Sequence, residues 1–456
     1  MSARPHHPLL VPAIAASQFA PPFMISGVAV ALPALGTDLG AGATALSLVE
    51  TVFLAASVAL LLPAGRLGDA ADKVAVFKLG MLAFAATSIL TGLTSSIGAL
   101  LGLRFVQGAA SAAVGASGAA IIADAVPPER RGKAFGITIG AIYAGLTLGP
   151  ICAGFLVGLW GWRSVFLAGG ATVLALLVPT HLMLRASWRR PAPRAVHWPS
   201  AVLVTAGMLA LVGGAATLRE GPAGWGAIAL GLLLLAAFIA LQPRLEAPLL
   251  NTALLLKNRV LAFALLVQTL LYCNAFGTVF LLSLYLQSVL GYSPHVAGEV
   301  LALGTLLMAA IAPAAGALAD RTRPALIAST GVAIVLAAAS LATFLRAGSS
   351  IVVVGLVLAI QGVGFAFFSS PNIAMVMNAV PRERSSLASA LSATARSLGM
   401  VGGMLIVGAL VSVNLGHQPV GADPARYIAT MHTAFWVLAA LTGAALAVSL
   451  FRTRQT

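Results

Sequence analysis

The chain has 456 residues, of which 60% are hydrophobic and 8% are charged, and its formal net charge is +14. A soluble globular protein typically carries about a quarter charged residues, so this composition excludes the soluble class. The positive excess indicates either a nucleic-acid-binding surface or the basic cytoplasmic loops of a membrane protein. The positions of the basic residues along the chain distinguish these two alternatives.

The sequence predicts fourteen membrane-spanning helices, because a helix that crosses the hydrocarbon layer needs about 20 mostly apolar residues. In chain order the apolar runs lie near residues 10–35, 45–63, 77–95, 98–123, 135–158, 164–184, 199–218, 223–241, 260–285, 296–318, 324–345, 351–375, 389–413 and 430–451. Strands of a membrane β-barrel would alternate apolar and polar residues, and these runs do not alternate. We therefore expect an all-α membrane protein.

The basic residues support this count and predict an orientation. With a cytoplasmic N-terminus, the inside segments hold 20 of the 26 basic residues. The outside segments hold Arg163, Arg219, Arg346 and Arg426. This distribution follows the positive-inside rule, and it removes the reason for a nucleic-acid partner. We expect a multi-pass protein of a bacterial inner (cytoplasmic) membrane, with both termini in the cytoplasm.

Two short patterns repeat at nearly the same offset. The pattern G-x-L-x-D occurs at residues 65–69 and again at 316–320, and V-P-x-E-R occurs at 126–130 and at 380–384. The second span thus corresponds to the tenth and the fourth to the twelfth. This duplication predicts a six-helix bundle over residues 1–190, two additional helices over 191–243 and a second six-helix bundle over 244–456. Two repeats around a central site are a common transporter plan.

Three motifs resemble those of the major facilitator superfamily. Residues 65–73 are similar to the family's motif between helices 2 and 3, with departures at Ala70 and Asp72, and Arg104 to Gly108 match its R-x-x-Q-G motif. The fifth span is similar to the family's antiporter motif, with Ala153 in place of a glycine. The positions that match are Gly65, Leu67, Asp69 and Lys73, with Asp320 in the second copy, and Gly136, Gly145, Gly149, Pro150 and Gly154.

The resemblance is to the family's fourteen-helix drug:proton antiporter branch, and it implies a major facilitator fold of two six-helix bundles plus two inserted helices. It implies an inner gate at Asp69 and Asp320, for which the alternative is a solvated turn carboxylate. It implies proton coupling at Arg104, for which the alternative is a side chain that reaches the outer interface. It also implies export, because exporters of the family carry the fifth-span motif and importers generally lack it.

The acid that would carry the proton is not at its usual place. Met24 stands where antiporters of this branch often have a carboxylate in the first helix. Of the twelve acidic residues, only Glu50 and Glu299 lie clearly within predicted spans. A carboxylate in lipid is costly and by default functional, although a neutral structural carboxyl is the alternative for each. We favour Glu50, because Arg104 belongs to the same half.

The remaining polar residues are less specific. Asn274 and Gln361 could line a substrate path or bond a neighbouring helix. The sequence has no phosphate-binding G-x-x-x-x-G-K-[ST] loop and no metal-ligand spacing among its seven histidines. We expect a monomer that is not an enzyme and has no cofactor or metal.

The predicted function is proton-coupled export of small hydrophobic or cationic drugs or toxins by alternating access. Its partners would be a small-molecule substrate, protons and the lipid bilayer. The alternatives are a dedicated exporter of a single metabolite or antibiotic, and a non-transporting membrane sensor.

Overall fold

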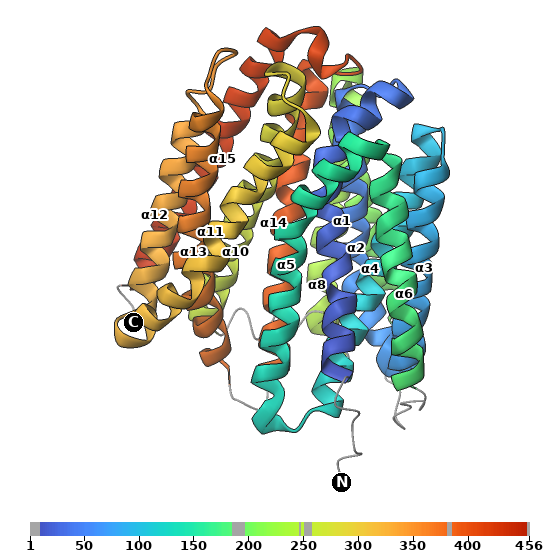
Figure 1. Cartoon of the computed structure of the whole chain (residues 1–456). Helices are drawn as coiled ribbons and strands as arrows, with labels where there is room; N and C mark the ends of the chain where they lie inside the picture. Colours follow the sequence, from blue (N-terminus) through green and yellow to red (C-terminus); the bar gives the residue numbers. More distant parts are fainter. Residues whose placement is uncertain (1–9, 185–196, 246–247, 250–257, 381–384, 454–456) are drawn as a thin grey trace. The chain divides into compact units, whose positions relative to one another are not determined.

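The computed structural model describes residues 10–184, 197–245, 248–249, 258–380 and 385–453 (Figure 1). Within this part of the chain, fourteen helices are long and apolar enough to cross a membrane. The fourteen predicted spans are thereby confirmed. Helices are the expected solution, because each backbone N–H and C=O group inside a bilayer must be bonded within its own segment.

The first eight long helices are α1 (Leu10–Leu39), α2 (Ala43–Ala70), α3 (Lys73–Leu93), α4 (Ile97–Ala125), α5 (Pro128–Trp160), α6 (Arg163–Met183), α7 (Trp198–Ala216) and α8 (Pro222–Leu241). Two short 3₁₀ helices, η1 (Leu218–Glu220) and η2 (Gln242–Arg244), flank α8. The second set is α10 (Arg259–Leu284), α11 (Pro294–Arg321), α12 (Pro324–Ala342), α13 (Ile351–Asn378), α14 (Ser385–Asn414) and α15 (Pro424–Thr453). A π-helical segment, η3 (Tyr285–Val289), extends α10, and a 3₁₀ turn, η5 (Val420–Ala422), precedes α15.

Local residue choices explain where many helices begin. Asp72, Asn258 and Ser293 each accept a hydrogen bond from a backbone N–H in the first turn of α3, α10 and α11, respectively. Such caps satisfy donors that have no partner within the helix. Helices α5, α8, α11 and α12 begin with proline at an initial position, where the missing N–H has no cost.

The chain divides into two compact units. Unit 1 holds α1, most of α2, and α3 to α8, and unit 2 holds α10 to α15. Two short segments of the first half of the chain, Gly40–Ser47 and Ala215–Glu220, also belong to unit 2. The division of the sequence at residues 190 and 243 stays a prediction.

The same pairs of helices pack together in both units. In unit 1, α1 packs on α5, and α3 packs on both α4 and α6. In unit 2, α10 packs on α14, and α12 packs on both α13 and α15. Figure 1 shows α1 beside α5 and α10 beside α14. These pairings are equivalent when the ninth span, α10, corresponds to the first, which is the correspondence that the repeated motifs predicted.

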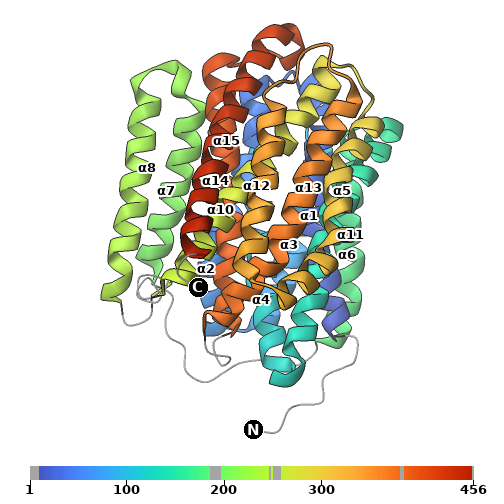
Figure 2. The ribbon, with the colours of Figure 1, turned by 90° about the vertical axis from the view of Figure 1, so that its left-hand side faces the viewer.

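The two inserted helices form a hairpin, drawn in light green in Figure 2. Glycines let them approach closely, because a Cβ at Gly207 would lie 3.2 Å from the carbonyl oxygen of Gly231. A Cβ at Gly231 would in turn lie 2.8 Å from the carbonyl oxygen of Gly207. Small residues at such crossings are typical of helix pairs in membranes.

One local expectation was wrong. The first copy of the G-x-L-x-D pattern, residues 65–69, was expected between the second and third spans, as a connecting loop, and its repeat at 316–320 in the equivalent place. The first lies instead in the last turns of α2 and the second in those of α11. The N–H of Ala71 still bonds the carbonyl oxygen of Leu67 at 2.8 Å. Glycine does not interrupt these helices, because the backbone bonds continue to the point where each helix ends.

Candidate functional site

The interior of unit 1 holds two opposite charges on neighbouring helices. Glu50 of α2 is 3% exposed, and Arg104 of α4 is 0% exposed. The guanidinium and the carboxyl group interact electrostatically. The structure therefore brings together the two residues that the sequence had singled out in this half. Among the side chains that the structure describes, Lys73 is the one other buried charge.

The guanidinium of Arg104 makes two hydrogen bonds within the protein and lies near two aromatic rings, of which Phe166 is the more distant at 5.9 Å. Its Nε donates to the carbonyl oxygen of Val49 at 3.0 Å, and its Nη1 donates to Oε1 of Gln107 at 2.7 Å. Its carbon lies 4.2 Å from the centre of the Phe53 ring, a distance at which a cation is attracted to the face of an aromatic ring. The side chain thus turns into the bundle and does not reach an interface.

Three buried polar atoms of this cluster have no hydrogen-bond partner. They are Oε1 of Glu50, Nη2 of Arg104 and Nε2 of Gln107. Each buried polar group without a partner costs about 1–3 kcal/mol, and native proteins retain few of them. The set comprises one acceptor, when the carboxyl is ionised, and two donors. A small polar group that donates one hydrogen bond and accepts two would match it.

Equivalent glycine contacts show which residues of unit 1 correspond in sequence to which residues of unit 2. A Cβ at Gly108 of α4 would collide with the carbonyl oxygen of Phe53 on α2, and a Cβ at Gly362 of α13 would collide with the carbonyl oxygen of Gly304 on α11. These contacts relate α4 to α13 by 254 residues and α2 to α11 by 251. Both offsets are those of the repeated sequence motifs.

This correspondence shows that the pair of charges formed by Glu50 and Arg104 has no copy in unit 2. The counterpart of Glu50 is Leu301 and that of Arg104 is Leu358, and both leucines are buried. The counterpart of Gln107 is the glutamine of α13, Gln361. The polar cluster is therefore specific to unit 1, while the packing around it is common to both.

Glu299, the second predicted acid, has a different setting. It lies in the second turn of α11, and its side chain is 55% exposed. Its Oε1 lies 3.4 Å from Nε2 of His295 on the same helix. Glu299 is thus neither buried nor placed against an arginine, so it is not the structural equivalent of Glu50.

One residue of the motif between α2 and α3 forms an ion pair with α4. Lys73, the first residue of α3, is buried, and its Nζ lies 2.8 Å from Oδ2 of Asp124 near the end of α4. Gly65 and Leu67 lie in the last turns of α2. The side chains of Asp69 and Asp320 lie outside the described residues. Asp124, which the sequence reasoning missed, follows the R-x-x-Q-G motif by several turns.

The glycines of the fifth-span motif let α5 pack directly on the backbone of α1. A Cβ at Gly145 would lie 2.5 Å from the carbonyl oxygen of Phe19, and a Cβ at Gly149 would lie 2.7 Å from that of Phe23. Pro150 and Gly154 continue this buried part of α5. The surroundings of Gly136 lie outside the described side chains.

Unit 2 has an equivalent close contact, between α14 and α10. Gly399 and Gly403 of α14 stand 254 residues after Gly145 and Gly149. A Cβ at either would collide with a backbone carbonyl oxygen of α10. The glycine pair is therefore explained in both units by close helix packing, independently of any transport direction.

The predicted substrate-path residues bond each other in unit 2. Nε2 of Gln361 donates to Oδ1 of Asn274 at 2.9 Å, and Nδ2 of Asn274 donates to Thr442 at 3.2 Å. Of the two readings that the sequence left open, these contacts support the bond between neighbouring helices. A second amide group joins Gln268 to Asn372 at 3.3 Å and to the Ser392 hydroxyl at 3.0 Å.

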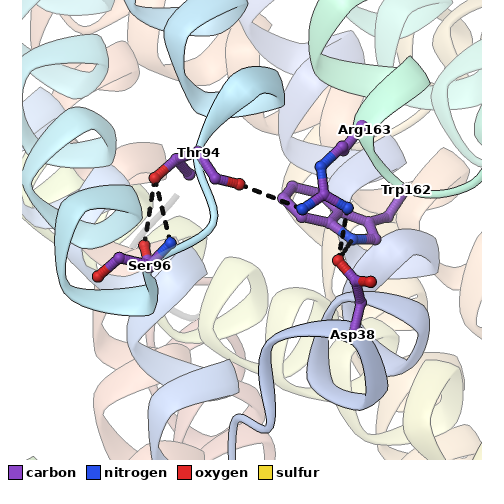
Figure 3. Close-up of polar contacts among 5 residues, drawn as sticks. All are labelled: Asp38, Thr94, Ser96, Trp162 and Arg163. Carbon is purple, nitrogen blue, oxygen red and sulfur yellow. Dashed lines mark hydrogen bonds and ion pairs between the residues drawn. The ribbon is translucent and has the colours of Figure 1, made fainter.

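An ionic cluster that the sequence reasoning missed joins the ends of three helices of unit 1 (Figure 3). Oδ2 of Asp38 accepts from Nε1 of Trp162 at 3.0 Å and from Nη1 of Arg163 at 2.5 Å. Nη2 of Arg163 donates to the carbonyl oxygen of Thr94 at 3.3 Å. Asp38 lies in the last turn of α1, Thr94 follows α3 and Arg163 begins α6, so the cluster connects these helix ends.

Comparison with known proteins identifies the family. The model of the Major Facilitator Superfamily matches residues 14–404 and 264–456. The chain belongs to the major facilitator superfamily. It is 30% identical to the tetracenomycin C resistance and export protein of Streptomyces glaucescens over 398 residues, which cover 85% of this chain and 73% of that protein.

Two further comparisons agree with this family. The chain is 24% identical to the riboflavin transporter RibZ of Clostridioides difficile, over 94% of this chain and 93% of that protein. The crystal structure of a peptide transporter of the POT family in complex with sulfate aligns with a TM-score of 0.72 and 15% identity, over 100% of this chain and 97% of that one. At this identity the match shows the fold alone, which is the predicted major facilitator fold.

The carboxylate that the drug:proton branch often has in its first helix is replaced in this chain. Met24, at the position where the drug:proton branch often has a carboxylate, is fully buried, and its sulfur occupies the space in which a Cβ of Gly169 on α6 would stand. This position therefore packs α1 against α6. Among the described residues, Glu50 is the one acidic side chain that is buried.

Proposed function

We propose that this major facilitator is a proton-coupled exporter of small hydrophobic or cationic compounds that works by alternating access. The observation that carries the proposal is the buried Glu50 beside Arg104, with unpartnered polar atoms on both. An arginine keeps its charge in proteins, whereas a carboxyl gains or loses a charge with one proton. Binding of a proton at Glu50 would therefore change the charge balance of this cluster.

A change of charge here can drive a change of conformation. A buried charge without a compensating partner is strongly destabilising, so an ionised Glu50 favours an arrangement in which Arg104 approaches it. A protonated Glu50 leaves Arg104 to its contacts with Val49 and Gln107. The two protonation states thus favour two arrangements of α2 and α4, as coupling of protons to movement requires.

Export is the direction that the relatives support. One relative carries resistance and export in its name. The charge distribution supports cytoplasmic termini in a bacterial inner membrane, and we propose that the chain works there as a monomer with the proton gradient as its energy source and without a cofactor.

The decisive test measures transport into everted membrane vesicles, where export appears as uptake into the vesicle. A panel of hydrophobic and cationic compounds would be compared in wild type and in Glu50→Gln, which keeps the size of the side chain and removes the titration. We expect wild-type uptake into the vesicles to stop when the proton gradient is collapsed, and Glu50→Gln to lose gradient-driven uptake. Asp423→Asn serves as the matched control, because Asp423 caps α15 through the N–H of Arg426 and asparagine caps equally well.

The outcomes separate the alternatives. If Glu50→Gln keeps its full dependence on the proton gradient, the coupling site is wrong. If one compound alone is moved, the chain is a dedicated exporter of a metabolite or antibiotic, an alternative that the names of single-compound relatives favour. If no compound is moved under any gradient, the non-transporting sensor remains.

A further inference from the structure

The inserted hairpin of α7 and α8 is divided between the two units. Its helices belong to unit 1, whereas the connection between them, Ala215–Glu220, belongs to unit 2. The start of α2 is divided in the same way, because Gly40–Ser47 belongs to unit 2 and the rest of the helix to unit 1. In the predicted orientation both connections lie on the outer side of the membrane.

The opposite end of the hairpin is fixed in unit 1. Gln242, which follows α8, is fully buried, and its Oε1 accepts from the N–H of Leu249 at 2.8 Å. Leu249 packs with Phe238 of α8 and with Leu62 of α2. Arg66 of α2 donates through Nη2 to the carbonyl oxygen of Pro248 at 2.6 Å. This end of the hairpin is thereby attached to the helix that carries Glu50.

The connecting segment contacts the end of α14. The hydroxyl of Ser412 donates to the carbonyl oxygen of Ala216 at 2.6 Å. Nε2 of His417 lies 3.7 Å from Oε1 of Glu220. The side chain of Arg219 covers Gly416, where its Cδ lies 3.3 Å from the place of a Cβ. Gly416 has a φ of 60°, a conformation that glycine adopts readily.

The start of α2 contacts the same stretch of unit 2. The hydroxyl of Thr44 donates to the carbonyl oxygen of Gly416 at 2.8 Å, and the N–H of Ala43 donates to that of Gln418 at 3.1 Å. Gly42 lies directly against the carbonyl oxygen of His417, where no Cβ would fit. Gly40–Ser47 and Ala215–Glu220 therefore both contact Ser412–Gln418, and all three segments belong to unit 2.

We propose that the connection between the inserted helices, Ala215–Glu220, is a gate element that must leave Ser412–Gln418 during each transport cycle. The inference rests on alternating access as proposed above. Because α7 and α8 are fixed in unit 1 and their connection is held in unit 2, a movement of one unit against the other strains this connection. The inserted helices are then part of the moving machinery rather than a passive linker.

The contacts of the connection suit a reversible gate. The His417 and Glu220 side chains are largely exposed, and exposed ion pairs contribute little to stability. The Ser412 hydroxyl is buried and bonds the backbone oxygen of Ala216. The groups of the exposed ion pair and of this single hydrogen bond can all bond to water when Ala215–Glu220 is released.

The test is a reversible cross-link across the contact. Glu220→Cys and His417→Cys are combined in a background with Cys152→Ala and Cys273→Ala, and the purified protein in vesicles is treated with a short bis-methanethiosulfonate. We expect efflux to fall in proportion to the cross-linked fraction seen on a gel, and to return when a reductant removes the cross-link. Each single-cysteine variant, treated identically, is the matched control and should keep its efflux.

Two outcomes would overturn the proposal. Full cross-linking with unchanged efflux would mean that Ala215–Glu220 need not separate from Ser412–Gln418. A double variant that fails to transport before treatment would instead be assessed by labelling Ser412→Cys with a membrane-impermeant maleimide. Because Ser412 is buried under Ala216, labelling should accelerate during turnover, and an unchanged labelling rate would equally refute the gate.

The test also distinguishes this inference from the proposed function. Efflux that depends on the proton gradient in the untreated protein supports the function whether or not the cross-link blocks it. Absence of any efflux in wild type would refute the function and leave no transport cycle for the gate to serve.

Discussion

The packing of α1 on α5 makes a quantitative prediction for Gly149→Ala. An alanine Cβ would lie 2.7 Å from the carbonyl oxygen of Phe23 and 3.0 Å from the amide nitrogen of Gly27, and it would also strike the hydroxyl of Ser26. Two of these three obstacles are backbone, which cannot rotate away. The helices must therefore separate, and overpacking of this kind typically costs about 1–3 kcal/mol.

Gly158 of the same helix supplies a matched control. A Cβ at this position would meet no atom within 4 Å, so Gly158→Ala has no steric cost. Alanine stabilises a helix by about 0.5–1 kcal/mol relative to glycine, and this gain is common to both variants. The difference in stability between them should therefore equal the overpacking cost of about 1–3 kcal/mol.

The measurement is the melting temperature of each purified variant in the same detergent, with efflux measured in parallel. We expect Gly149→Ala to melt below wild type and Gly158→Ala to melt at or above it. Equal melting temperatures for the two variants would refute the conclusion that α5 needs a glycine at position 149 for packing. A stable Gly149→Ala that has lost efflux would instead assign the glycine a role in movement.

Three further predictions follow from individual contacts. Arg104→Lys should lose efflux and about 1–3 kcal/mol of stability, because one ammonium cannot replace both hydrogen bonds and the contact with Phe53. Vesicle uptake and the melting temperature test this prediction, and full activity would contradict it. Gln242→Leu should lower the melting temperature, because it leaves the buried N–H of Leu249 without an acceptor at a cost of about 1–3 kcal/mol; an unchanged melting temperature would show that another acceptor replaces the glutamine. Asp38→Asn should change the melting temperature little, because the ionic cluster is half exposed and screened by solvent; a large decrease would show that the cluster is essential to unit 1.

Sequence reasoning predicted the spans because the length of an apolar run is set directly by bilayer thickness. It also predicted the register between the halves, because two motifs kept their offsets and the glycine contacts at Gly108 and Gly362 reproduce them. Glu50 and Arg104 were identifiable because charges inside a span are rare and costly. These features are all readable along a single helix.

Features that depend on contacts between distant segments could not be predicted. The different settings of Glu50 and Glu299 follow from which face each helix turns inward, which their similar depths in the sequence do not specify. The Asp38 cluster joins three helix ends whose proximity is known only from the fold. The division of the hairpin between two units depends on contacts of Ala215–Glu220 nearly 200 residues along the chain.

The replacement of the charge pair by Leu301 and Leu358 in unit 2 has an electrical consequence. Moving one elementary charge through a membrane potential of 100 mV changes its free energy by about 2.3 kcal/mol. Within the described side chains of the bundle interior, the groups on which this voltage can act are in unit 1. Among the described side chains, any voltage dependence that arises from buried charges therefore originates in the first half of the chain, which holds Glu50, Lys73 and Arg104.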